Sequence, residues 1–308
     1  MKLTVARFPL LVMFMAVASG SLAQTPQKQA PKLAVPVKLT TAAVKTSEHV
    51  FKRTPQGELK LSVFQPADWK ASDKRPGILF FFGGGWKHGT PAQFQPQAEY
   101  FAARGMVAAC AEYRISSKHQ TTPDKCIEDA KSAVRWLRSH AGELGLDPDR
   151  IIAAGGSAGG HLAAATALVP GFDAKEDDLR VSCKPGALVL FNPALNSPEF
   201  SVKDSEGKPL SGFWPTPFLS KESPPSIIFF GTADEVSQGR EYLARAKELG
   251  CHSELYTAEG QPHGFFNRPP WLQVTTRQVD EFLTSLGYLT GQPTLESPPG
   301  SSSLKREE

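Results

Sequence analysis

The sequence predicts an α/β fold with a mostly parallel central sheet, helices on both faces and no large cap domain. Two patterns support this prediction. The strand-like segments are continuous apolar runs, as expected for strands buried on both faces. Amphipathic helical segments alternate with them, which is typical of parallel strands joined by crossover helices. The composition, 40% hydrophobic and 21% charged residues, is that of an ordinary globular protein.

The elements follow from these patterns in chain order. Residues 48–64 predict two short strands, an antiparallel hairpin that opens the sheet. Buried strands are predicted over 77–82, 106–113, 151–155, 187–191 and 226–231. Apolar residues recurring at spacings of three and four predict helices over 123–141, 238–249 and 271–286, and a helix-compatible run covers 158–168.

Both ends of the chain are predicted to lie outside the folded domain, which spans 47–290. Residues 1–23 have a basic start, an apolar stretch and small residues up to Ala23, typical of a cleavable signal peptide. We therefore expect a secreted or periplasmic protein without a membrane anchor after cleavage. An anchoring helix is the alternative, but the apolar stretch is short for a ~30 Å hydrocarbon layer. Residues 24–46 predict a flexible lead-in, and 291–308 a disordered tail.

Charge and metal-ligand patterns argue against two classes of function. The formal net charge is +3, and no Lys/Arg cluster is interleaved with aromatic residues, so nucleic-acid binding has no support. No CxxC pair occurs and the seven histidines are scattered, so no metal is implied. The cysteines, which permit two disulfides of undetermined pairing, are Cys110, Cys126, Cys183 and Cys251. Cys110 lies in an apolar strand pattern, where a buried free thiol is common.

A serine flanked by glycines lies where a predicted strand meets a predicted helix. In Gly155-Gly156-Ser157-Ala158-Gly159, the sharp turn forces unusual backbone angles on Ser157. Cβ atoms at positions 155 and 159 would collide with neighbouring backbone, so glycine is required there. The helix N-terminus adds free N–H groups and a positive dipole end beside the serine. An ordinary glycine-rich turn is the alternative, but this context predicts a catalytic nucleophile at Ser157.

A nucleophilic serine needs a general base, and in folds with this elbow the base follows the serine in the chain. Three histidines do so. His161 lies one turn into the elbow helix and cannot reach back, and His252 begins a strand. His263 lies in a loop between Pro262 and Gly264, which suits a base that reaches the elbow. We therefore expect His263 to be the base.

The orienting acid is expected between the serine and the base. Asp234 directly follows the buried strand 226–231, where this fold class gathers functional side chains. Asp204, in a charged surface stretch, and Glu235 are competitors. A helix cap is the alternative role for Asp234, but its order before His263 favours a catalytic role.

Three glycines follow another predicted strand. In Phe82-Gly83-Gly84-Gly85-Trp86, bare glycine backbone can approach a substrate and direct N–H groups at a developing negative oxygen. The expected oxyanion donors are Gly84, Gly85 and the N–H of Ala158. A purely structural glycine-rich connection is the alternative.

With these pieces in order, residues 48–289 resemble the esterase/lipase branch of the α/β-hydrolase superfamily, and most nearly its carbohydrate acetyl-esterase and feruloyl-esterase-like group. Gly155–Gly159 matches the family's nucleophile elbow, and Phe82–Trp86 its His-Gly-Gly-Gly-Trp. Glu112-Tyr113-Arg114 is similar to its Asp-Tyr-Arg. One departure is that Phe82 replaces the His that braces the oxyanion loop, so packing is expected to hold the loop here.

The resemblance implies a serine esterase that needs no cofactor and cleaves short acyl esters, such as acetyl or feruloyl groups on plant polysaccharide, through an acyl-enzyme. Substrate contacts are expected from Trp86, Phe265 and Trp214, although core packing explains them nearly as well. Residues 196–221 are expected to form a small lid or substrate wall, or else a packed surface loop. A serine peptidase and a non-catalytic binding protein on the same fold are the alternatives.

Overall fold

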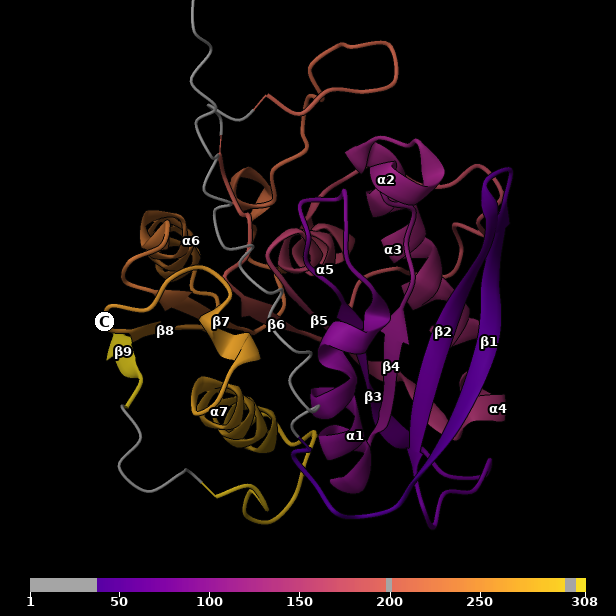
Figure 1. The fold of residues 1–308 in the computed structure, drawn as a ribbon, viewed down its shortest axis with the longest axis vertical. Helices are drawn as coiled ribbons and strands as arrows, with labels where there is room; N and C mark the ends of the chain where they lie inside the picture. The colour runs from indigo at the N-terminus through magenta and orange to yellow at the C-terminus, as the bar shows by residue number, and fades with distance from the viewer. Residues whose placement is uncertain (1–37, 198–200, 297–302) are drawn as a thin grey trace, which may run out of the picture. The chain divides into compact units, whose positions relative to one another are not determined.

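The computed structural model describes residues 38–197, 201–296 and 303–308. Its centre is a nine-stranded sheet in the order β1-β2-β4-β3-β5-β6-β7-β8-β9 (Figure 1). The strands are β1 (Val44–Thr54), β2 (Gly57–Pro66), β3 (Arg75–Phe81), β4 (Val107–Ala111), β5 (Leu146–Gly156), β6 (Ala187–Phe191), β7 (Ser226–Gly231), β8 (Ser253–Ala258) and β9 (Lys305–Glu307). Strands β4, β3, β5, β6, β7 and β8 are parallel, whereas β1, β2 and β9 pair antiparallel with their neighbours. The predicted α/β fold is confirmed.

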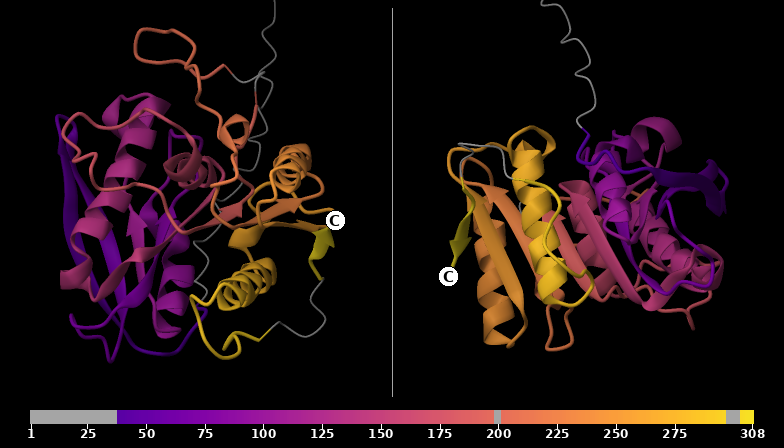
Figure 2. Two further views of the ribbon diagram at one scale, coloured as in Figure 1. Left: turned by 180° about the vertical axis from the view of Figure 1, so that it is seen from behind. Right: turned by 90° about the horizontal axis from the view of Figure 1, so that it is seen from below.

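Helices cover both faces of the sheet. The helices are α1 (Gln95–Ala103), α2 (Ser116–His119), α3 (Pro123–Ser139), α4 (Ala141–Leu144), α5 (Ala158–Leu168), α6 (Val236–Glu248) and α7 (Trp271–Ser285), with short 3-10 turns at Pro91–Phe94, Thr216–Phe218 and Phe265–Asn267. Helices α1 and α7 pack on one face, and α3, α5 and α6 on the other (Figures 1 and 2).

The alternation of side chains along the central strands divides the core into two halves. In β3, Ile78 and Phe80 belong to the half under α1 and α7, while Leu79 and Phe81 belong to the half under α3 and α5. All four side chains are buried. Burial of each such side chain contributes roughly 1.5–3 kcal/mol. The apolar runs are continuous because both faces of these strands are covered.

The parallel strands end at one edge of the sheet. The loops after β3, β5, β6, β7 and β8 leave from this edge, so residues far apart in the chain meet there. The expected site residues all lie in or beside these loops or on the elements that follow them.

The structure differs from the predicted boundaries at both ends of the domain. The first strand begins at Val44, inside the predicted lead-in, because the β1–β2 hairpin pairs from Val44 and Pro66 onward. The prediction of a disordered tail is wrong for 305–307, which form β9 against the edge of β8. Ion pairs hold β9 in place, with Arg306 on Glu254 at 3.1 Å and Arg240 on Glu307 at 3.2 Å. The predicted signal peptide lies outside the described residues, as does the lead-in up to residue 37.

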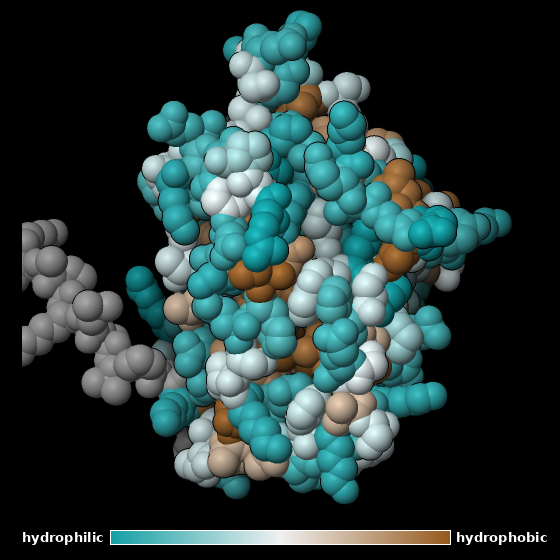
Figure 3. All heavy atoms as spheres, turned by 90° about the vertical axis from the view of Figure 1, so that its right-hand side faces the viewer, coloured by the Kyte–Doolittle hydropathy of each residue, from teal (hydrophilic) through white to brown (hydrophobic). Residues whose placement is uncertain are grey.

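The cysteines and the surface of the described residues show no further prominent feature. All four cysteines lie in the described part of the chain and are free. The side of the molecule that carries β1 and β2 is mainly hydrophilic, with small separate hydrophobic spots (Figure 3). Within the described ranges, Leu179 is the one large hydrophobic side chain that is strongly exposed, and none of the helices has the length and apolarity that crossing a bilayer requires.

Candidate active site

The elbow at the end of β5 holds Ser157 in a conformation that few residues adopt. Its backbone angles are φ 54° and ψ −120°, a strained region for a residue with a side chain. The turn is tight because a Cβ at position 159 would lie 2.0 Å from the Phe81 carbonyl oxygen, and one at position 155 would lie 2.3 Å from that of Gly159. The two glycines therefore let the elbow press against β3 while Ser157 stands at its tip.

Three loops bring a hydrogen-bonded chain of side chains together. Ser157 Oγ lies 2.9 Å from His263 Nε2, and His263 Nδ1 lies 2.9 Å from Asp234 Oδ2. An ionised carboxylate only accepts hydrogen bonds, so Nδ1 carries the proton and Nε2 is free to accept from the serine hydroxyl. This is the arrangement in which a histidine acts as general base toward a serine.

The electrostatics of this chain favour an anionic Asp234. Burial raises the pKa of Asp234. Hydrogen bonds from His263, a backbone N–H and Asn192 together lower this pKa by more, so the net shift is downward from its ordinary value of 3.8. The hydrogen bond to Asp234 raises the pKa of His263 above its ordinary value of 6.5, against a smaller lowering by burial. A carboxylate in this position favours the protonated form of the imidazole.

One contact of Asp234 was not expected from the sequence. The amide Nδ2 of Asn192 donates to Asp234 Oδ2 at 2.5 Å, and Asn192 is almost fully buried. Asn192 follows β6 and has a positive φ of 43°. The position of Asn192 directly after a predicted strand could have indicated this contact, because polar residues at the carboxyl ends of parallel strands gather at one edge of the sheet. No local motif marks it.

The competing residues lie in structural environments. His161 is fully buried with Nε2 3.0 Å from the Phe213 carbonyl oxygen, and burial lowers its pKa to about 4. His252 lies at the surface, 3.3 Å from Glu254. The Asp204 carboxylate accepts from two backbone N–H groups of its own loop, and Glu235 accepts from Gln238 at the start of α6.

The glycine loop after β3 presents its backbone beside Ser157. Gly84 has φ +125°, and a Cβ there would lie 2.1 Å from the His88 carbonyl oxygen. Hydrogen bonds from the N–H groups of Gly84, Gly85 and Ala158 to other parts of the described chain are absent. The neighbouring N–H of Gly83, in contrast, donates to Gln93 Oε1 at 2.6 Å. The three expected donors therefore remain available to a ligand.

The position of the family's bracing His is filled by a stacked aromatic pair. Phe82 stacks on Tyr113, with ring centroids 4.1 Å apart and planes inclined by 17°. The Tyr113 hydroxyl donates to the Phe82 carbonyl oxygen at 2.7 Å. Packing plus one hydrogen bond thus holds the base of the glycine loop.

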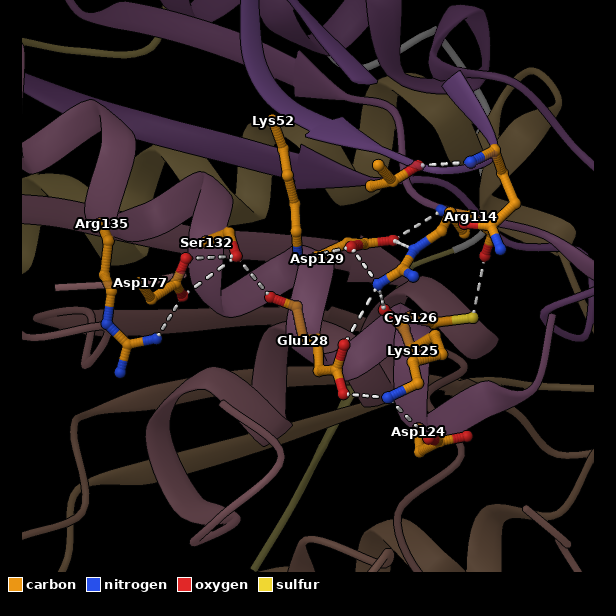
Figure 4. Close-up of polar contacts among 12 residues, drawn as sticks. Lys52, Arg114, Asp124, Lys125, Cys126, Glu128, Asp129, Ser132, Arg135 and Asp177 are labelled. Carbon is orange, nitrogen blue, oxygen red and sulfur yellow. Dashed lines mark hydrogen bonds and ion pairs between the residues drawn. The ribbon is translucent and has the colours of Figure 1, made fainter. Parts of the chain in front are cut away.

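A buried charge cluster anchors the residue after Tyr113. Asp129 of α3 accepts from the backbone N–H, Nε and Nη2 of Arg114 at 2.8–2.9 Å and lies 2.8 Å from Lys52 Nζ on β1. Figure 4 shows both cations directed at the Asp129 carboxylate. Glu128 adds a further pair with Arg114 at 3.2 Å. The segment that holds the glycine loop is therefore fixed to α3 and β1.

A recess of about 620 Å³ lies between the glycine loop and the His263 loop. Ser157 and His263 open onto it, and its walls include Thr90, Gln93, Phe266 and Asn267 among other residues. It is large enough for a small ligand. The described residues contain no group of three His, Cys, Asp or Glu side chains suited to a metal.

The residues expected to bind substrate do not line this recess. Trp86 is buried edge-on to His161, with centroids 5.2 Å apart, and Trp214 lies 6.4 Å from Trp86. Phe265 packs edge-on against Trp271 at 5.4 Å, whereas its neighbour Phe266 reaches the recess. The expectation is wrong for a common reason, because Trp86 and Phe265 are buried and Trp214 is partly buried against other aromatic side chains, as core packing predicts.

The segment expected to form a lid or wall is anchored by the same aromatic cluster. Phe213 is buried, stacks on His161 at 4.2 Å and lies 5.5 Å from Trp86. Phe218 is partly buried against the same core half. Residues 198–200 of this segment lie outside the described residues. Its aromatic anchor thus packs against Trp86, the residue after the three glycines, and against His161 of α5.

Comparisons with known proteins identify the family of the chain. The BD-FAE family model matches residues 61–186. The structure of Thermogutta terrifontis esterase 2 superposes with a TM-score of 0.75 at 44% sequence identity, covering 84% of this chain and all of that one. The chain belongs to the α/β-hydrolase esterases.

Curated relatives of this esterase are longer proteins. The probable carboxylic ester hydrolase LipM of Mycobacterium tuberculosis is 36% identical over 223 residues, which is 64% of this chain and 50% of LipM. Esterase LipQ of the same organism is 25% identical over 267 residues, 76% of this chain and 63% of LipQ. The chain thus spans half to just under two thirds of these two relatives.

Proposed function

We propose that this esterase hydrolyses carboxylic esters with Ser157 as nucleophile, His263 as general base and Asp234 as orienting acid. The observation that carries the proposal is the hydrogen-bonded chain Ser157–His263–Asp234, with both distances at 2.9 Å, beside backbone N–H groups without acceptors. Removal of one oxyanion donor typically lowers turnover by about 10²–10³.

The reaction follows from the positions of these groups. Ser157 Oγ attacks the ester carbonyl carbon while His263 Nε2 takes its proton, and the carbonyl oxygen becomes an oxyanion bound by Gly84, Gly85 and Ala158 N–H groups. His263 then protonates the leaving alcohol, and an acyl group remains on Ser157. His263 then takes a proton from water, whose oxygen attacks the acyl carbon. The bond from that carbon to Ser157 Oγ breaks, His263 returns the proton to Oγ, and the carboxylic acid leaves.

The proposed substrates are short acyl esters of a polar alcohol, such as acetyl or feruloyl groups on plant polysaccharide. The polar side chains of Thr90, Gln93 and Asn267 around the recess support a polar alcohol. Structures of the Thermogutta terrifontis enzyme with bound propionate and butyrate support short acyl groups. Action on polysaccharide outside the cell agrees with the signal peptide predicted from residues 1–23.

Hydrolysis of 4-nitrophenyl acetate by the wild type and Ser157→Ala tests the proposal. We expect the variant to lose about 10⁶-fold in kcat, with an unchanged melting temperature because Ser157 side-chain loss leaves the elbow glycines intact. A fluorophosphonate should label the wild type and not the variant. Equal rates in the two proteins would contradict the function. A series of nitrophenyl esters, acetylated xylan and feruloyl esters then ranks the substrates.

A further inference from the structure

A pair of side-chain amides connects the glycine loop to the loop that carries His263. The backbone N–H of Gly83 donates to Gln93 Oε1 at 2.6 Å. Gln93 Nε2 donates to Asn267 Oδ1 at 3.0 Å, and Asn267 Nδ2 donates to the Gly264 carbonyl oxygen at 3.0 Å. Both amides line the recess beside Ser157.

The backbone groups at the two ends of this series of hydrogen bonds determine how both amides are oriented. Gly83 offers an N–H, so the oxygen of Gln93 must face it. The NH₂ group of Gln93 then faces Asn267, which must present its oxygen and turn its own NH₂ toward Gly264. A flip of either amide would place two donors or two acceptors together. The orientation is therefore set by backbone groups of the two catalytic loops.

We propose that Gln93 is a positioning residue for the oxyanion hole and that Asn267 acts through it, together coupling the oxyanion loop to the base loop. This inference rests on the proposed esterase function. The Gly83 N–H is occupied by Gln93, which leaves those of Gly84 and Gly85 as the donors that face substrate. The bridge thereby sets the orientation of the peptide unit that precedes both donors.

Close packing makes the loop sensitive to this contact. A Cβ at position 83 would lie 2.9 Å from the Gly156 carbonyl oxygen and 3.3 Å from Ser157 Cβ, so the loop backbone runs directly over the nucleophile. The hydrogen bond from Tyr113 reaches only the Phe82 carbonyl oxygen. Gln93 is the side chain that holds the next peptide N–H. Small shifts of such donors lower turnover strongly.

Substitutions at the two amides separate positioning from folding. Gln93→Leu removes both of its hydrogen bonds, while Gln93→Glu keeps an acceptor for Gly83 and loses the donor to Asn267. The matched control is Gln95→Leu, because Gln95 lies two residues away and its amide donates to Glu99 at the surface at 2.8 Å. The assay is 4-nitrophenyl acetate hydrolysis, together with melting temperature and the rate of fluorophosphonate labelling.

We expect Gln93→Leu to lower kcat about tenfold, a part of the 10²–10³-fold effect of losing a donor outright, with KM within about twofold. Gln93→Glu should lose less, Asn267→Leu about threefold, and Gln95→Leu nothing. The double variant Gln93→Leu/Asn267→Leu should match Gln93→Leu, because Asn267 acts through Gln93.

Three results would overturn the inference: kcat of Gln93→Leu within twofold of wild type, an equal loss in Gln95→Leu, or losses that multiply in the double variant. If Gln93→Leu melts at a lower temperature, Gln93→Glu is the deciding variant. A smaller loss of kcat than in Gln93→Leu supports the inference, and an equal loss contradicts it. A wild type without Ser157-dependent hydrolysis would instead contradict the proposed function, so the two failures are distinguishable.

Discussion

Two carboxylates of this protein bind cationic or cationisable partners in contrasting ways. Asp234 pairs with His263, whose side chain is 53% exposed, at the open edge of the sheet. Asp129 pairs with Arg114 and Lys52 under α3, and its own side chain is fully buried. One carboxylate faces a partner whose charge changes near neutral pH, and the other faces two permanent cations.

The difference separates the proposed reactive site from a structural one. A histidine whose pKa is raised by a carboxylate can accept and return a proton during a reaction. An arginine never releases its proton in proteins, so the Arg114–Asp129 pair cannot take part in proton transfer. Together with Lys52, it instead holds β1, α3 and the segment after β4 together. Both pairs rely on extra hydrogen bonds to the carboxylate, from Asn192 at the site and from the Arg114 backbone in the cluster.

The largest expected effect is on the reactive pair. Asp234→Asn should lower kcat about 10⁴-fold, because the amide no longer holds the correct histidine tautomer or stabilises the imidazolium. Ester hydrolysis measures the loss of activity of the variant, and circular dichroism shows whether the variant is still folded. A loss below tenfold would show that Asp234 is not the orienting acid.

The same variant carries a pH signature. Hydrolysis requires neutral His263, so kcat/KM of the wild type should fall as pH drops through a His263 pKa above 6.5. Asp234→Asn removes the carboxylate that raises this pKa, so the residual activity should keep its acid limb at lower pH. An unshifted limb would assign the titration to another group.

The structural pair should respond in stability. Asp129→Asn leaves Arg114 and Lys52 buried without their counter-charge, which should lower the free energy of unfolding by about 3–5 kcal/mol. Urea denaturation measures it. The control is Asp178→Asn, which breaks an exposed pair with Arg180 and should leave the midpoint unchanged. Equal midpoints in both variants would remove the distinction between buried and exposed pairs.

The smallest expected effect concerns β9. Hydrogen bonds from Arg240 and Thr257 hold the pKa of Glu307 below its ordinary value of 4.5, with burial opposing. The stability from this contact is therefore present above pH 4.5 and is lost as pH falls through the lowered pKa. Glu307→Gln should lower the unfolding free energy by about 0.5 kcal/mol at neutral pH, and by less in acid. An equal loss at both pH values would rule out a contribution from charge.

Local sequence determined the fold class and the core of the site. Continuous apolar runs predict buried strands because both faces are covered, and the glycines around Ser157 are required by the turn itself. Chain order then singled out Asp234 and His263, which the structure brings into hydrogen-bond contact with each other and with Ser157.

Tertiary structure alone decided what surrounds these residues. Gln93 and Asn267 are 174 positions apart, and Asn192, Asp234 and His263 meet only because parallel strands end at one edge of the sheet. Strand β9 pairs with β8 across 48 positions or more, and Trp86, Trp214 and Phe265 pack against other aromatic side chains rather than lining the recess. These contacts join residues that are far apart in the sequence and belong to no common local motif. Their stability depends on neighbours that come together only when the chain folds.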